Sequence, residues 1–64
     1  SNQGHWEVND AGWWYQYSDG TYPRSSWVNI SNKWYYFDEN GVMASNTWID
    51  NYYVNSDGKW KGTR

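Results

Sequence analysis

Residues 27–37, with the sequence WVNISNKWYYF, decide the fold of this chain. The segment opens and closes with runs of β-branched and aromatic residues, which favour extended strands, and the polar pair Ser31 and Asn32 separates the two runs. Two such runs around a two-residue turn predict a β-hairpin. In the register of that hairpin, Trp27 lies opposite Tyr36.

Side chains alternate between the two faces of a hairpin, and here the two faces differ in chemistry. The first face carries aliphatic and aromatic groups typical of a core: Val28, Ile30, Tyr35 and Phe37. The second face carries Trp27, Asn29, Trp34 and Tyr36. The pattern predicts that the first face is buried between stacked units and that the second offers rings to a ligand.

This hairpin is the middle unit of a repeat. One constant offset along the sequence places Trp6 on Trp27, Trp27 on Trp48, and Gly20 on Gly41. The repeat divides one domain, residues 1–64, into units that span approximately residues 5–25, 26–46 and 47–64.

The third unit is shorter than the second, because Gly58 follows Gly41 more closely than Gly41 follows Gly20. Removing the same number of residues from each strand keeps Trp48 opposite Tyr53, with a turn at residues 50–51. The sequence Asp-Asn of that turn suits a left-handed backbone conformation. We therefore expect a shortened hairpin over residues 47–54.

The first unit permits two alignments with the second. The gapless alignment equates Trp13 with Trp34 and puts Gln16 at an apolar position, whereas a one-residue shift equates Trp14 with Trp34 and puts Tyr17 there. We expect the shift, because it keeps the core apolar.

A loop that contains Gly among Asp or Asn residues follows each hairpin, which indicates tight turns that need positive φ. No helical period of apolar residues is present. Because an isolated hairpin is marginally stable in water, successive hairpins must stack. The predicted fold is all-β: a short β-solenoid of three stacked β-hairpins joined by Gly-containing loops.

The composition narrows the function. Fifteen of the 64 residues are aromatic, and no Cys is present for a disulfide framework or a thiolate metal site. The net charge of −2 disfavours nucleic acid as a partner. No apolar run is long enough for a membrane span or a signal-peptide core, so we expect any export signal to lie outside this segment.

Catalysis and metal binding are not expected. An enzyme needs a nucleophile with a base, or carboxylates held together in a cleft. Most carboxylates here fall in predicted turns, where they are ordinary turn formers: Asp19, Asp38, Glu39, Asp50 and Asp57. His5 is the single histidine and has no Cys or second His with which to share a metal. We therefore expect no catalytic residue, metal or cofactor.

Residues 32–43, NKWYYFDENGVM, resemble the repeat of the choline-binding, or cell-wall-binding, modules of Gram-positive bacteria and their phages. Residues 12–23 and 51–58 resemble the same repeat. The resemblance implies a left-handed solenoid in which choline of teichoic acids sits between consecutive units, in a cage of aromatic rings beside a Met. It also implies a secreted or cell-surface module, usually appended to a hydrolase or an adhesin.

The resemblance also implies which residues bind. The expected main cage lies between the second and third units and consists of Trp27, Trp34, Tyr36, Met43, Trp48 and Tyr53. A cage between the first two units would use Trp6 and Trp14. In the third unit Asn51 replaces the second hairpin Trp, and Trp60 replaces the Met.

Two other functions stay open. Related repeats occur in glucan-binding enzymes and toxins, where sugars stack on rings, and Asn side chains here could serve such a ligand. Alternatively, the module is a structural spacer or forms a homodimer through its open solenoid ends. A WW-type peptide binder is disfavoured, because no proline follows the second Trp of the pair.

Overall fold

The structure is a computed structural model that describes residues 3–63. The described chain forms seven β-strands and no helix. The strands are β1 (Gly4–Asn9), β2 (Gly12–Tyr17), β3 (Ser26–Ile30), β4 (Lys33–Phe37), β5 (Thr47–Ile49), β6 (Tyr52–Val54) and β7 (Trp60–Thr63).

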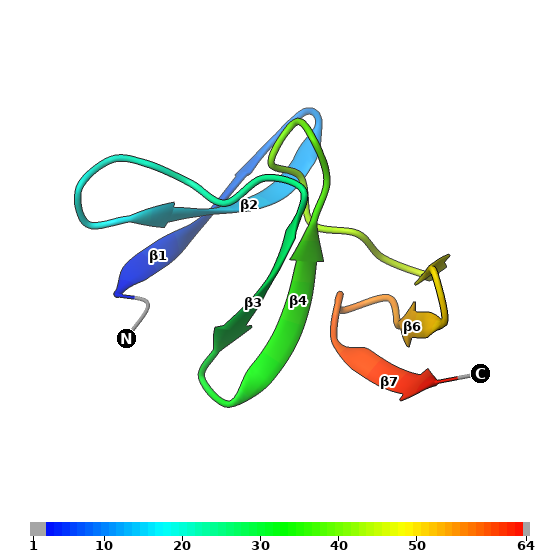
Figure 1. Cartoon of the computed structure of the whole chain (residues 1–64). Helices are drawn as coiled ribbons and strands as arrows, with labels where there is room; N and C mark the ends of the chain where they lie inside the picture. Colours follow the sequence, from blue (N-terminus) through cyan, green and yellow to red (C-terminus); the bar gives the residue numbers. More distant parts are fainter. Residues whose placement is uncertain (1–2, 64) are drawn as a thin grey trace.

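The strands form three separate antiparallel units, β1–β2, β3–β4 and β5–β6–β7. The hairpin β3–β4 lies between the other two units, and β7 lies beside β4 (Figure 1). The expected all-β fold of stacked hairpins is confirmed.

The middle hairpin has the predicted register, with Trp27 opposite Tyr36. Its turn residues Ser31 and Asn32 have φ of 55° and 66°, the positive values that a type I′ turn requires at both central positions. The shortened hairpin β5–β6 keeps its predicted register as well. Its turn residue Asp50 has a φ of 55°, as expected from the Asp-Asn sequence.

The expected one-residue shift in the first hairpin is wrong. β1 pairs with β2 so that Trp6 lies opposite Tyr15, as Trp27 lies opposite Tyr36, and this register makes Trp13 the equivalent of Trp34. The shifted alignment would keep the polar Gln16 side chain out of an apolar core. In the described chain, however, no hairpin covers that face of β1–β2, and the Gln16 amide donates to the Gly20 carbonyl (3.3 Å).

Strand β7 was not predicted. Residues 60–63 lack alternation, but the repeat contains a signal for this strand. In the second unit Phe37 pairs with Met43 in an isolated bridge, and in the third unit Val54 pairs with Trp60 at the equivalent place. The third unit extends that single bridge into a strand at the edge of the sheet.

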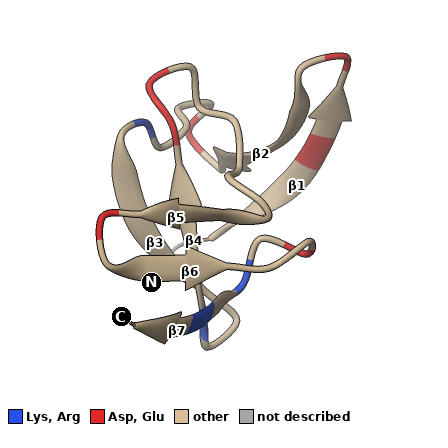
Figure 2. Cartoon of the chain, turned by 90° about the vertical axis from the view of Figure 1, so that its right-hand side faces the viewer, with Lys and Arg blue, Asp and Glu red and all other residues tan. Residues whose placement is uncertain are grey.

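The loops after the hairpins share a hydrogen-bond pattern. The Asp38 carboxylate accepts bonds from the backbone N–H groups of Asn40 (2.8 Å) and Val42 (2.9 Å). The Asn55 side chain accepts two bonds of 3.0 Å at the equivalent places in the next loop. The acidic residues lie mainly in loops and turns (Figure 2), as their turn-forming role predicts.

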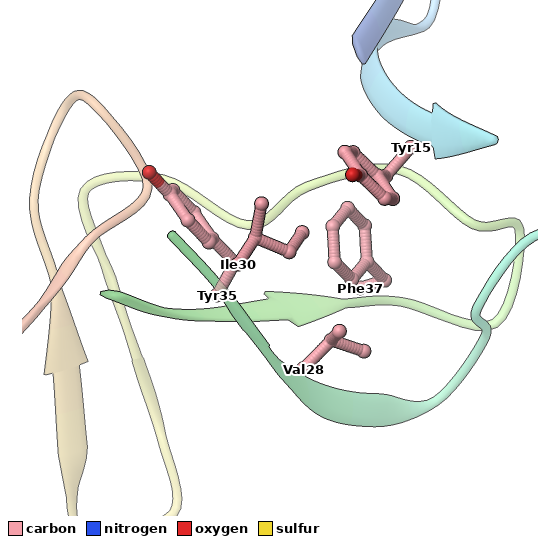
Figure 3. Close-up of a cluster of buried hydrophobic side chains, with 5 residues drawn as sticks. All are labelled: Tyr15, Val28, Ile30, Tyr35 and Phe37. Atoms are coloured by element: carbon pink, nitrogen blue, oxygen red, sulfur yellow. The ribbon is translucent and has the colours of Figure 1, made fainter. Parts of the chain in front are cut away.

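The core lies between the first two hairpins. Its buried side chains are Tyr15, Val28, Ile30, Tyr35 and Phe37 (Figure 3). Four of the five come from the predicted core face of β3–β4, and Phe37 is fully buried. Trp6 reaches this cluster from β1, with its ring centroid 4.9 Å from that of Tyr35 and 5.8 Å from that of Phe37. Ring packing between units therefore replaces a conventional aliphatic core.

Two loop glycines provide a test of this packing. Gly20 and Gly41 both have positive φ, but a Cβ at Gly41 would lie 2.6 Å from the Tyr22 ring, whereas a Cβ at Gly20 would meet nothing within 4 Å. Gly20→Ala should cost about 1 kcal/mol for the left-handed conformation. Gly41→Ala should cost about 2–4 kcal/mol, because overpacking adds to that strain. Equal losses in urea unfolding would contradict the packing of Tyr22 against this loop.

Candidate functional site

The first cavity lies between the first two hairpins and has a volume of about 450 Å³. It is lined by Trp6, Trp13, Tyr35, Met43, Ser56 and Asp57. These residues come from β1, β2, β4, the loop after β4, and the loop between β6 and β7. Segments from all three units thus meet at this cavity.

Ring packing and one backbone hydrogen bond position the residues of the first cavity. The Trp6 and Trp13 rings lie edge to face, with centroids 6.4 Å apart, and Trp6 makes a similar contact with Tyr35. The Met43 backbone N–H donates to the Trp13 carbonyl (2.7 Å), which attaches the loop after β4 to the first hairpin. This attachment places Met43 beside the rings, in the lining of the cavity.

The second cavity lies between β3–β4 and the third unit and has a volume of about 270 Å³. Its lining is entirely aromatic: Trp27, Trp34, Tyr52 and Trp60. The Trp27 and Tyr52 rings lie edge to face across the two units, with centroids 5.8 Å apart. The Trp60 indole is oriented by its N–H, which donates to the Gly62 carbonyl (2.9 Å).

The two cavities are equivalent in the repeat. The sequence offset that superimposes the first two hairpins places Trp6 on Trp27 and Trp13 on Trp34. A smaller offset, which reflects the shorter third unit, places Tyr35 on Tyr52 and Met43 on Trp60. Each cavity therefore takes two Trp from one hairpin and a Tyr plus a Met or Trp from the next unit, and the first cavity adds Ser56 and Asp57 from the third unit.

The cavities differ in how far their rings reach solvent. Trp13 is 47% exposed, and in the second cavity Trp34, Tyr52 and Trp60 are each 43–44% exposed. Tyr35 is the buried member of the first cavity, and burial, followed by the nearby Asp57 carboxylate, raises the pKa of its hydroxyl. Half-exposed rings around a hollow are available for contact with a ligand.

The structure divides the expected main cage between two places. Trp27 and Trp34 line the second cavity together, as expected, and Tyr36 packs against Trp27 at a centroid distance of 5.3 Å. Met43 lies instead in the first cavity with Trp6. The reason is that the loop after β4 folds back toward the first hairpin, to which it is hydrogen-bonded.

Besides Tyr36, three further expected residues line neither cavity. Trp48 and Tyr53 form a ring pair, with centroids 5.2 Å apart, on the face of β5–β6 opposite to Tyr52. Neighbouring residues of a strand point to opposite faces, so Tyr52 and Tyr53 cannot both face β3–β4. Trp14 points away from Trp13 for the same reason and packs against Tyr22, at a centroid distance of 5.5 Å.

The expected cages omitted three lining aromatic residues, namely Tyr35, Tyr52 and Trp60, and they included Trp13 only as the disfavoured alternative to Trp14. The repeat identifies these residues only once the stacking of the hairpins is known. The face of one hairpin that carries its two cavity Trp residues, the Trp face, meets the core face of the next unit. The third ring of each cavity therefore comes from the Tyr35 position and not from the Tyr36 position.

Within residues 3–63, no three His, Cys, Asp or Glu side chains gather closely enough to hold a metal ion. The same part of the chain has no helix with the length and apolar character to cross a membrane.

Comparison with known proteins gives the family. The choline-binding repeat profile matches residues 21–60, which is more than half of the chain. The chain belongs to the choline-binding repeat family. This match covers the second unit and most of the third, and so includes all four residues of the second cavity.

Relatives of this choline-binding repeat chain include a lysin of Pneumococcus phage Dp-1, 33% identical over 46 residues, which cover 69% of this chain and 16% of the lysin. Among solved structures, the multimodular endolysin of phage Cp-1 complexed with choline has a TM-score of 0.88 and 32% identity, over 95% of this chain and 19% of the endolysin. A choline-binding domain from Streptococcus pneumoniae has a TM-score of 0.85 and 35% identity, over 97% of this chain and 75% of the domain. The chain thus spans less than a fifth of the two phage enzymes.

The lining of the second cavity can be tested with two Trp of equal exposure. Trp48 and Trp60 are both 44% exposed and belong to one sheet, but only Trp60 lines the cavity. With choline as the probe, Trp60→Ala should weaken binding there by about 0.5–2 kcal/mol, the scale of one cation–π contact. Trp48→Ala should leave calorimetric binding unchanged. A larger loss from Trp48→Ala would place the site on the outer face of β5–β6.

Proposed function

We propose that the chain is a non-catalytic cell-wall-binding module that recognises choline at the two ring-lined cavities. The observation that carries the proposal is the equivalence of the cavities, each of which presents two Trp and a Tyr from consecutive units. Rings needed only for a core would be buried, whereas most of these are half exposed. The repeat therefore forms two hollows lined by half-exposed rings, and the packing of a core alone does not require them.

The chemistry of the second cavity suits a quaternary ammonium group. Such a cation has no N–H to donate, so it needs no acceptor, and it is held by the electron-rich faces of several rings. Trp27, Trp34, Tyr52 and Trp60 supply rings and no carboxylate. A cavity of about 270 Å³ is slightly smaller than the sites that hold drug-sized ligands, as suits a small headgroup.

The first cavity offers the same cation three rings and a thioether. The polarisable sulfur of Met43 takes the place that the Trp60 ring has in the second cavity. Both cavities then bind the trimethylammonium group by ring contact. The hydroxyl end of choline points outward, where teichoic acid carries the headgroup as a phosphocholine ester.

The cellular setting follows from this ligand. Choline borne on teichoic acid is displayed on the bacterial surface, so the module acts outside the cell and brings an attached domain to the wall. The phage lysin and the multimodular phage endolysin support an attached domain, since each is several times longer than this chain. The residues described here have the binding role, and any cleavage of the wall belongs to another domain.

The test uses two matched truncations. Trp13 and Trp34 are equivalent, and each is roughly half exposed, so neither Trp13→Ala nor Trp34→Ala removes a buried core group. Calorimetry with choline should find two sites in the unsubstituted chain. Each variant should lose about tenfold in affinity at one site only, and the double variant at both.

A parallel titration with glucose oligomers separates choline from sugar as the ligand. Choline at tens of millimolar should raise the melting temperature, because a ligand that binds only the folded state stabilises it, and glucose oligomers should not. Saturation by glucose oligomers with no response to choline would replace the choline proposal by a glucan-binding one.

A further inference from the structure

The two equivalent cavities differ in one charged group. The first cavity has Asp57 at its wall together with Ser56, whereas the second cavity is lined by aromatic residues alone. Both polar residues belong to the loop between β6 and β7, which reaches across the middle hairpin to the first cavity. A loop of the third unit therefore completes a cavity formed mainly by the first two units.

Local structure holds Asp57 at this wall. The Asp57 backbone N–H donates to the Asn55 side chain (3.0 Å), and Gly58, with a φ of 81°, packs directly against the thioether of Met43. The Tyr35 hydroxyl points toward the same loop (Figure 3). Proximity to the Asp57 carboxylate adds to burial in raising the pKa of Tyr35. The charge therefore lies beside a lining residue of the first cavity.

The Asp57 carboxylate is available to a ligand. No salt bridge or side-chain hydrogen bond within residues 3–63 engages it, although its backbone is fixed in the turn. A carboxylate attracts any cation and also accepts an N–H bond from an ammonium ion that retains a proton. Rings attract the cation as well, but they offer a poorer acceptor for such a proton.

We propose that Asp57 makes the first cavity a site for protonated as well as quaternary ammonium groups, whereas the second cavity selects the quaternary group. This inference rests on the proposed function and adds a difference in ligand preference between the two cavities. A partly methylated amine loses methyl–ring contacts in both cavities. It recovers an N–H bond to a carboxylate only in the first cavity.

The repeat provides a conservative substitution and a matched control. Asn40 occupies the place of Asp57 in the preceding loop, so Asp57→Asn puts a residue there that this loop geometry already accepts. Asp19 occupies the same place in the first loop and lines neither cavity. Asp19→Asn therefore makes the same charge change at a distance from the two sites.

The experiment isolates each cavity and varies the charge of the ligand. Trp34→Ala leaves the first cavity to be measured, and Trp13→Ala leaves the second. Three probes of similar shape are titrated by calorimetry at low salt: choline, protonated dimethylaminoethanol, and the neutral isostere 3,3-dimethylbutan-1-ol. Asp57→Asn and Asp19→Asn are then added to each background.

In the Trp34→Ala background, Asp57→Asn should weaken choline binding about threefold, the scale of an exposed charge pair. Protonated dimethylaminoethanol should lose at least as much, and the neutral alcohol should be unaffected. Added salt should reduce the difference between the chains with and without Asp57, because exposed charges are screened. Asp19→Asn should have no effect, and Asp57→Asn should have none in the Trp13→Ala background.

Two results would overturn the inference while leaving the proposed function in place. One is choline binding to the first cavity that is indifferent to Asp57→Asn. The other is an equal loss for the neutral alcohol, which would mean that Asp57 acts through packing and not through charge. Absence of choline binding to the unsubstituted chain would contradict the inference and the proposed function together.

Discussion

Trp6 of the first hairpin packs edge to face on Tyr35 of the second, and Trp27 of the second hairpin does the same on Tyr52 of the third. A two-stranded hairpin is marginally stable in water, so each unit depends on such contacts with its neighbour. These contacts join opposite kinds of face, since the Trp face of one hairpin meets the core face of the next. Side-chain alternation along each strand makes the two kinds of face possible.

The two cavities follow from the same contacts. Where the two faces meet, the inner rings bury one another, and the outer rings at positions such as Trp13 and Trp34 stay half exposed around a hollow. Stability and, in the proposed function, ligand contact thus depend on different members of one ring cluster. In that proposal, a ligand in the hollow contacts two units and stabilises their stacking.

The loops make the two cavities different. The loop after β4 brings Met43 back to the first hairpin, and the loop between β6 and β7 brings Asp57 to the same cavity. At the second cavity the chain forms β7 instead, which supplies Trp60. Equivalent cavities consequently have different fourth partners, and only the first has a charged group at its wall.

The sequence predicted the hairpins, their registers in the second and third units, and the core face of β3–β4, because strand periodicity and turn chemistry are local properties. It did not predict which face of a neighbour each Trp meets. That choice depends on how whole hairpins stack, so Tyr53 and Trp48 were expected where Tyr52 and Trp60 lie. The preference for Trp14 failed because it assumed an apolar core around Gln16, where a side chain–backbone hydrogen bond is sufficient.

The central claim is that choline lies against equivalent sets of rings in both cavities. Intermolecular nuclear Overhauser effects between the trimethylammonium protons of choline and isotope-labelled Trp and Tyr side chains measure this directly. We predict contacts with Trp6, Trp13 and Tyr35, and with Trp27, Trp34, Tyr52 and Trp60, but none with Trp14 or Trp48. Contacts confined to the Trp48 and Tyr53 pair, or to Trp14 and Tyr22, would contradict the account.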